Sequence, residues 1–400
     1  MRQLPPLSVA EVDRQQRLAA GTGRMLIGFG RSVPETMNLV STPECWQRQA
    51  DGRWRCLQRL RSPGATGLRL GLQLEALPSG AVLRFHNSDQ TQSFTLSAAE
   101  AELDSGLYWS PTTVGESVTL ELLIPAEADP EQIIVAVPIV SHLFRLPWLQ
   151  EEVHRETDCI RDVACDKEAE RLSRATALIL FTDADGETGT CTGTLIAGAE
   201  SATEIPYLLT AHHCVSDQPK ASSVESVWGY RVRECDGSAA IPQWVRGGAD
   251  LLTVVTSADS SLLRLRHTPP EGAAFVRWST ALPLEGEPVV SIHHPHGAPQ
   301  KITEGRIKDY LHCEDAAYCG EDADPDGIHY LSVAWTAGVT DSGSSGSGLF
   351  LASTGELIGV LSGGLSSCEN LEGVDDYGWL GVAYREGLDF WLGQTSESPR

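Results

Sequence analysis

The segment LLTAHHC, residues 208–214, ends an apolar run in two histidines and a cysteine. A general base needs a rigidly held imidazole, and His213 at the end of a predicted strand meets that requirement. Cys214 can anchor the strand end through a disulfide, with Cys191 as its natural partner, worth about 3 kcal/mol in the chain-entropy model. Taken alone, two histidines and a cysteine are more often structural or metal-binding.

A carboxylate precedes a second apolar run in ADSSLL, residues 258–263. Asp259, buried at the start of that strand, can accept the ring N–H of a general base and stabilise the imidazolium that forms during catalysis. On its own, an aspartate at this position is more often a turn residue that opens a strand.

A serine lies among glycines in DSGSSGSGLF, residues 341–350. Ser345 in this tight loop is a candidate nucleophile, and the amides of Gly343 and Ser345 are candidates for an oxyanion hole. A flexible Gly/Ser linker is the alternative, but predicted strands on both sides argue against it.

The order of the three candidates along the chain is histidine, aspartate, serine, as in chymotrypsin-type enzymes. An α/β-hydrolase would need Gly-x-Ser-x-Gly, and the residue two positions after Ser345 is Ser347. Two other functions stay open: a non-catalytic binding protein on a protease-like scaffold, and a metal-dependent hydrolase, although no HExxH motif occurs. The histidines for the metal-dependent alternative are His212, His213, His293, His294 and His296.

Composition narrows the class of protein. The 400 residues carry a net charge of −24, which disfavours nucleic acid and anionic membranes as partners. No apolar run is long enough to span a membrane. The first 18 residues lack the apolar core of a signal peptide, so export implies that a signal peptide has already been removed and Met1 added.

The pattern of the chain predicts an all-β protein with two domains, residues 1–152 and 153–400. The first part shows a helix over 9–20 and strands over 68–74, 81–85, 117–124 and 132–140. The run 45–56 predicts a disulfide-stapled hairpin with a primed turn at Asp51-Gly52. The second part shows short strands over 177–181, 190–196, 207–210, 251–256, 261–265, 289–293, 330–334, 348–351 and 357–362, and a C-terminal helix over 385–392.

Ten cysteines indicate a disulfide framework from an oxidising compartment. No CxxC pair occurs, which makes a zinc site a weak alternative.

With these segments together, residues 155–395 resemble the bacterial lysyl endopeptidase branch of the trypsin-like serine proteases. The motifs that carry the resemblance are YLLTAHHC, GVTDSGSSGS, DCIRDVAC, TCTGTLI, SIHHP and GGLSSC. The resemblance implies two packed antiparallel six-stranded β-barrels with the triad in the cleft between them. The preceding β-rich half then resembles the pro-domain of such precursors, with a sandwich-like fold.

The resemblance also implies the cysteine pairing. It pairs Cys159 with Cys368, Cys165 with Cys235, and Cys191 with Cys214. The remaining pairs follow from proximity and are Cys45–Cys56 and Cys313–Cys319.

Substrate preference follows from the family segment that matches DDYG, residues 375–378. Its first aspartate, Asp375, lies at the base of the primary pocket in the family, and a buried carboxylate there favours lysine or arginine before the scissile bond. The alternative is a solvated acidic loop, and Asp376 is the reserve candidate for the pocket.

The substrate-binding strand is expected at Ser362, Gly363 and Gly364. The family has a histidine where this chain has Ser362, and a tryptophan partner is absent from residues 313–326. The preference between lysine and arginine therefore stays open, and Ser362 can instead hydrogen-bond Asp259.

Control of activity is the last expectation. Vertebrate-type zymogens have an aspartate directly before the nucleophile, paired with a new N-terminal amine, and here Ser344 stands there. The N-terminal domain is therefore the better candidate for control, with cleavage near Arg155. We expect a secreted or periplasmic serine endopeptidase that acts on proteins or peptides with basic residues. We also expect it to act as a monomer, with no cofactor or metal and with its own pro-domain as a partner.

Overall fold

The structure is a computed structural model and describes residues 2–20, 25–101, 106–149, 157, 159–198, 205–235, 237–315, 318–321 and 327–393. No helix within these ranges is long and apolar enough to cross a membrane. The chain forms two compact units, one of Met1–Leu146 with Phe181–Gly189 and one of Pro147–Leu180 with Thr190–Arg400. Residues 150–156 are outside the described ranges, so the domain boundary at 152/153 stays a prediction, as does the cleavage site at Arg155.

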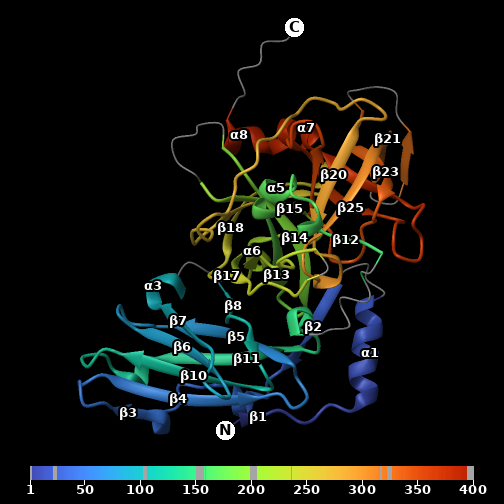
Figure 1. The fold of residues 1–400 in the computed structure, drawn as a ribbon. Helices are drawn as coiled ribbons and strands as arrows, with labels where there is room; N and C mark the ends of the chain where they lie inside the picture. The colour runs from blue at the N-terminus through green and yellow to red at the C-terminus, as the bar shows by residue number, and fades with distance from the viewer. Residues whose placement is uncertain are drawn as a thin grey trace. The chain divides into compact units, whose positions relative to one another are not determined.

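The first unit contains two β-sheets (Figure 1). One has the order β1 (Arg2–Gln3), β4 (Trp54–Arg61), β10 (Ser117–Ile124), β6 (Val82–Asn87) and β7 (Ser93–Ser97), with β3 (Trp46–Arg48) paired to β4. The other contains β2 (Met25–Ser32), β11 (Ile134–Leu143), β5 (Gly67–Glu75) and β8 (Tyr108–Trp109), with β9 (Thr113–Val114) paired to β5.

Both sheets of the first unit contribute to one apolar core. Phe85 and Leu120 come from the first sheet, Leu70 and Val135 from the second, and all four side chains are fully buried. Because alternate residues of a strand point to opposite faces, each sheet presents one apolar face to this core. Two facing sheets with a shared core make the unit sandwich-like.

Two local predictions for this unit have different outcomes. Helix α1 spans Val9–Ala20 as predicted, and Ser8 and Glu11 form a capping box at its start. The prediction of a primed turn in the β3–β4 hairpin was wrong. Gly52 has a positive φ of 86°, whereas the φ of Asp51 is not positive. The Gln49 amide donates to the Arg53 carbonyl at 2.8 Å, so residues 50–52 form a three-residue loop with glycine in the left-handed position.

The second unit contains two antiparallel strand systems. The first follows the order β17 (Gln243–Val245), β16 (Glu225–Trp228), β13 (Thr176–Thr182), β14 (Thr188–Ile196), β15 (Tyr207–Ala211), β19 (Ser260–Leu265) and β18 (Ala249–Val255). It forms a half-barrel, since no pairing among the described residues joins its two ends.

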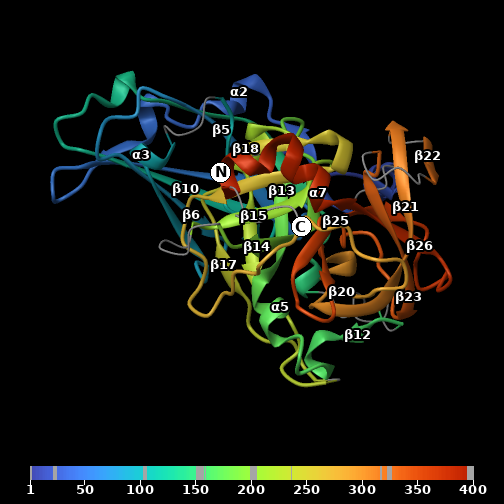
Figure 2. The same ribbon diagram turned by 90° about the horizontal axis from the view of Figure 1, so that it is seen from above.

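The second strand system is a closed barrel of six strands, grouped together in Figure 2. Its order is β21 (Lys301–Asp315), β20 (Pro288–His293), β24 (Gly348–Leu351), β25 (Leu357–Gly364), β26 (Val374–Trp379) and β23 (Tyr330–Ala337). Strand β23 pairs back to β21 and closes the ring. Strands β12 (Arg161–Asp162) and β22 (Tyr318–Glu321) also pair with β21, both antiparallel. The all-β prediction is confirmed.

Short helices complete the two units. They are α2 (Glu35–Asn38), α3 (Ala98–Ala101), α5 (Glu170–Ala175) and α6 (Gln218–Ser222), with 3-10 turns at Pro43–Cys45, Pro130–Gln132, Pro147–Leu149, Val163–Cys165, Thr256–Ala258 and Pro295–Gly297. The C-terminal helical segment begins at Leu380 rather than at residue 385, and runs through α7 (Leu380–Ala383), a π-helical turn (Tyr384–Leu388) and α8 (Asp389–Leu392). The sequence did not indicate a start at Leu380, because the apolar run of residues 379–383 is also typical of a strand.

Four of the five expected disulfides are formed. They join Cys45 to Cys56, Cys159 to Cys368, Cys165 to Cys235, and Cys191 to Cys214. The backbone of Cys313 pairs with that of Cys319 where β21 and β22 run side by side. The structure does not describe the side chains of these two cysteines. The Cys313–Cys319 disulfide therefore stays a prediction.

Candidate active site

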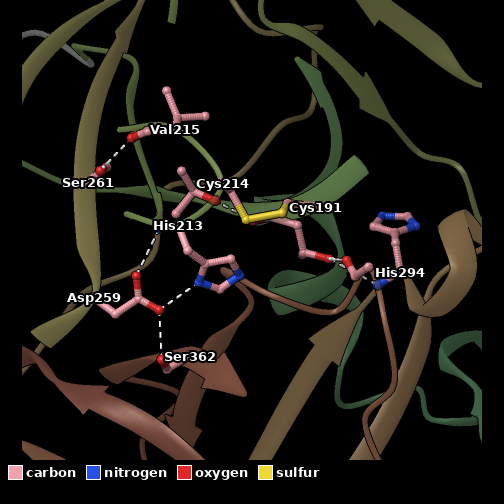
Figure 3. Close-up of a disulfide and its surroundings, with 11 residues drawn as sticks. Cys191, His213, Cys214, Val215, Asp259, Ser261, His294 and Ser362 are labelled. Carbon is pink, nitrogen blue, oxygen red and sulfur yellow. Dashed lines mark hydrogen bonds and ion pairs between the residues drawn. A yellow bond between two sulfur atoms is a disulfide. The ribbon is translucent and has the colours of Figure 1, made fainter. Parts of the chain in front are cut away.

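His213 and Asp259 come together because β15 and β19 are antiparallel neighbours. The register pairs Ala211 with Ser260, so residues just beyond the end of β15 lie beside those just before β19. The Nδ1 atom of His213 lies 2.7 Å from Oδ2 of Asp259, and the His213 amide donates to Oδ1 at 2.9 Å. Figure 3 shows the imidazole and the carboxylate facing each other. One carboxylate thus fixes both the backbone and the ring of the histidine.

The backbone of Asp259 adopts the left-handed conformation, with φ 40° and ψ 47°. This conformation is uncommon outside glycine, but aspartate tolerates it better than most residues do. The Asp259 carbonyl accepts the His212 amide at 3.0 Å. The strained residue is therefore held by both its main chain and its side chain.

Opposing effects act on the pKa of Asp259, which is only 8% exposed. Burial raises the pKa of this carboxyl, but the hydrogen bond and charge of His213 and the Ser362 hydroxyl outweigh burial and leave the pKa below its usual value. An ionised Asp259 keeps the proton on Nδ1 of His213 and leaves Nε2 free to accept one.

Ser362, on β25, donates its hydroxyl to Oδ2 of Asp259 at 2.7 Å. The same oxygen faces Nδ1 of His213, so the carboxylate is bound from two sides (Figure 3). Of the two roles considered for Ser362 from the sequence, the structure forms the hydrogen bond to Asp259.

The loop that carries Ser345 is attached to β14 through Thr192. The Thr192 amide donates to the Ser345 carbonyl at 2.8 Å, and its hydroxyl donates to the Gly343 carbonyl at 3.1 Å. Thr192 follows Cys191, whose disulfide partner is Cys214. A ring nitrogen of His213 lies within 4.8 Å of the sulfur atoms of Cys191 and Cys214. The nucleophile candidate and the base candidate are therefore anchored at the same disulfide.

No hydrogen bond joins the Ser345 hydroxyl to His213 in the part of the chain that the structure describes. Such contacts are often long in substrate-free enzymes and shorten in the complex. The amides of Gly343 and Ser345 also lack a backbone acceptor among the described residues. Gly343 has a φ of 91°, a conformation that favours glycine. Two unused amides on either side of Ser344 are suited to bind an oxyanion.

Asp375, on β26 beside β25, is buried, with 1% of its surface exposed. Its register partner on β25 is Gly364, and any Cβ at Gly364 would lie 2.1 Å from Oδ1 of Asp375. Oδ2 accepts the Trp335 ring N–H at 2.6 Å and the Thr340 hydroxyl at 2.7 Å. The Ser366 hydroxyl also donates to Oδ2, and its amide donates to Oδ1 at 3.1 Å. This carboxylate is therefore not part of a solvated acidic loop.

Asp376 points to the other face of β26. Burial raises the pKa of its carboxyl, while a hydrogen bond from Ser332 acts against the shift, and its Oδ1 has no hydrogen-bond partner among the described residues.

The residues considered for a metal do not assemble into a metal site. Among the described residues, the one group of converging ligand atoms is Cys191, His213 and Cys214. Its two sulfurs are bonded to each other, so neither is a thiolate. Nδ1 of His293 bonds Ser344, and Nδ1 of His294 bonds the Ala298 carbonyl. The donor set for a metal-dependent hydrolase is not brought together.

Some residues of the site had no role assigned to them from the sequence. Thr192 lies in TCTGTLI, where only the cysteine stood out. Trp335, Thr340 and Ser366 surround Asp375 from three separate segments, and only the fold brings them together.

The sequence matches two families along its length. Residues 153–378 match the lysyl endopeptidase C-terminal domain, and residues 3–144 match the lysyl endopeptidase N-terminal domain. The chain belongs to the lysyl endopeptidase family. It is 30% identical over 385 residues to the lysyl endopeptidase of Pseudomonas aeruginosa, covering 89% of this chain and 79% of that protein. Family membership makes this chain a trypsin-like serine endopeptidase with peptide substrates.

Solved serine proteases are similar to part of the chain. A thermostable serine protease from an extremophilic microorganism has a TM-score of 0.38 and 15% identity, covering 56% of this chain and all of that one. The active form of a protease from M. tuberculosis has a TM-score of 0.37 and 17% identity, covering 60% of this chain and 93% of that one.

Proposed function

We propose that this lysyl endopeptidase family member hydrolyses peptide bonds after lysine, and also after arginine, through a triad of His213, Asp259 and Ser345. The observation that carries the proposal is the 2.7 Å contact between Nδ1 of His213 and Oδ2 of Asp259. His213 directly precedes Cys214, and the disulfide of Cys214 with Cys191 also anchors the Ser345 loop.

In the proposed mechanism, Nε2 of His213 removes the proton of Ser345 as the hydroxyl oxygen attacks the peptide carbonyl. Asp259 holds the imidazolium that forms. The amides of Gly343 and Ser345 bind the oxyanion, and removing one such donor costs about 100- to 1000-fold in kcat. His213 then protonates the leaving amine, and water hydrolyses the acyl-enzyme.

Asp375 is the proposed base of the pocket for the basic side chain. Its place beside Gly364, which with Ser362 and Gly363 forms the substrate-binding strand, supports this role. Its carboxylate accepts hydrogen bonds only from neutral groups among the described residues, so its charge remains for a substrate cation to balance. Lysine fits a charged pocket of this kind, and no described feature rejects arginine.

We propose further that the protein is exported and made as a precursor. The four disulfides suit an oxidising compartment. The match of residues 3–144 to the N-terminal domain of the family supports a pro-domain. We propose that this pro-domain is cut off near Arg155. We expect the active enzyme to be a monomer.

Cleavage of a peptide library, read by mass spectrometry, tests the specificity. Cuts should follow lysine and arginine; cuts that follow neutral residues as often would contradict the pocket assignment. N-terminal sequencing of the active enzyme tests the processing site, and a first residue far from 156 refutes Arg155.

A further inference from the structure

Ser344, directly before the nucleophile, has a buried partner in the same unit. Its hydroxyl lies 2.7 Å from Nδ1 of His293, at the end of β20, and both residues have 0% of their surface exposed. The Ser344 hydroxyl also accepts the Asp341 amide at 3.2 Å. Ser344 therefore links the loop to itself and to the closed barrel.

The protonation of His293 follows from its surroundings. Burial lowers its pKa to about 3, so the ring is neutral in ordinary buffers. Nε2 has no hydrogen-bond partner among the described residues. In either tautomer of the neutral ring, Nδ1 and the Ser344 hydroxyl share one hydrogen bond, with the proton supplied by the ring or by the hydroxyl.

A second set of contacts joins the same two segments. The His296 amide donates to the Ser342 carbonyl at 2.6 Å, and its Nε2 lies 3.3 Å from Oδ2 of Asp341. Any Cβ at Gly343 would lie 3.0 Å from the His294 carbonyl oxygen. The turn after β20 thus contacts the loop along its length, while Thr192 holds the opposite side.

These contacts have a consequence for catalysis. The two amides proposed for the oxyanion hole flank Ser344, so any rotation of Ser344 moves both of them. In a vertebrate-type zymogen, an aspartate in this place is drawn into position by a new N-terminal ammonium. Here the position is fixed by neutral groups of the protease domain itself.

We propose that His293 is a positioning residue for the oxyanion hole, acting through its hydrogen bond to Ser344. The inference rests on the proposed function of Ser345 and adds to it how the loop is held. Because the hydrogen bond needs no free N-terminus, the loop is formed before any cleavage of the chain.

Three substitutions of His293 in the full chain test the proposal. Asparagine places a side-chain amide, which can donate or accept, near the position of Nδ1; glutamine places it near Nε2, and alanine offers neither. We expect His293→Asn to keep kcat within a few-fold. His293→Gln and His293→Ala should lose about 10- to 100-fold in kcat with KM unchanged, less than the loss of a whole oxyanion donor.

The rate of reaction with a fluorophosphonate should fall in parallel, with kcat expressed per titratable active site so that misfolded protein is not counted. His294→Gln is the matched control, since this buried ring bonds the Ala298 carbonyl and not the loop. It should lower thermal stability and leave kcat unchanged.

Equal kcat in His293→Asn and His293→Gln, or an undiminished kcat in His293→Ala, would overturn the proposal. If His293→Ala does not fold, Ser344→Ala gives the second reading, with the same loss expected and an unchanged kcat as the contrary result. Failure of the triad itself is seen separately, as turnover by Ser345→Ala.

Discussion

Thr192 and Ser345 are joined backbone to backbone, with the Thr192 amide donating to the Ser345 carbonyl at 2.8 Å. Thr192 is also the neighbour of Cys191, and Cys214 at the other end of that disulfide follows His213. The same strand, β14, is therefore bonded both to the segment of the base candidate, through the disulfide, and to the loop of the nucleophile candidate, through Thr192. Several expectations about activity depend on this connection.

Replacing Cys191 and Cys214 together by alanine should impair both stability and catalysis. Loss of a disulfide that closes this loop costs about 3 kcal/mol in the chain-entropy model. Because the same bond anchors His213 and the Ser345 loop, kcat should fall as well. Denaturant unfolding and steady-state kinetics measure the two effects. The Cys45–Cys56 pair is the control: its removal should leave kcat unchanged, and an unchanged kcat in both variants would contradict the anchoring role.

Asp259→Asn should reduce kcat about 10⁴-fold, because the amide favours the wrong tautomer of His213. Ser362→Ala should have a smaller effect, on the order of 1 kcal/mol or about fivefold in kcat/KM, as one hydrogen bond to the carboxylate is lost. The pKa of Asp259 should rise in Ser362→Ala, because one of the hydrogen bonds that lower it is lost. If both variants lose activity equally, Ser362 has a role beyond binding Asp259.

Asp375→Asn tests the pocket with substrates that differ only in the residue before the cleaved bond. Leaving a substrate cation without its buried partner costs about 3–5 kcal/mol. The kcat/KM for lysine and arginine substrates should therefore fall by roughly 100- to 5000-fold, while that for a glutamine substrate should not. Asp376→Asn, on the other face of β26, should leave the preference unchanged. The reverse pattern would move the pocket to Asp376.

Acid should destabilise the second unit through His293 and His294. Burial lowers their pKa values to about 3 and about 4, while the unfolded chain has histidines with pKa about 6.5. The unfolded state therefore binds more protons below pH 6.5, and stability falls as the pH drops from about 7 toward 4. At pH 5 the loss is about 2 kcal/mol for each histidine.

Denaturant titration at pH 7 and pH 5 measures this loss, and His294→Gln should remove roughly half of it. Equal unfolding free energies at the two pH values, with the wild-type chain, would contradict the assignment of two buried neutral histidines.

Much of the strand pattern was predictable, because alternation and turn residues are local signals. Strands β10 and β24 and helix α1 have the predicted bounds. The long strand β21 was missed, since charged residues such as Glu304 and Lys308 interrupt its apolar positions. Such a strand is specified by its pairing with both β20 and β23, which the local sequence does not contain.

The candidate site likewise contains residues that local sequence signals identify and contacts that they do not. His213, Asp259 and Ser345 were identifiable because each stands in a segment of unusual composition, and a family resemblance joined them. The contact of His293 with Ser344 joins residues separated by 51 positions through ordinary residue types. Only the closed barrel brings them together, so no pattern in the sequence marks the pair.

The central claim is that Ser345 is the nucleophile. The most direct measurement is reaction of the purified enzyme with a fluorophosphonate, followed by mass spectrometry of its peptides and by assay of lysine ester hydrolysis. The account predicts one label, on the peptide that contains Ser345, with loss of activity in proportion to labelling, and neither labelling nor turnover in Ser345→Ala. A label on another residue, or turnover that persists in Ser345→Ala, would contradict it.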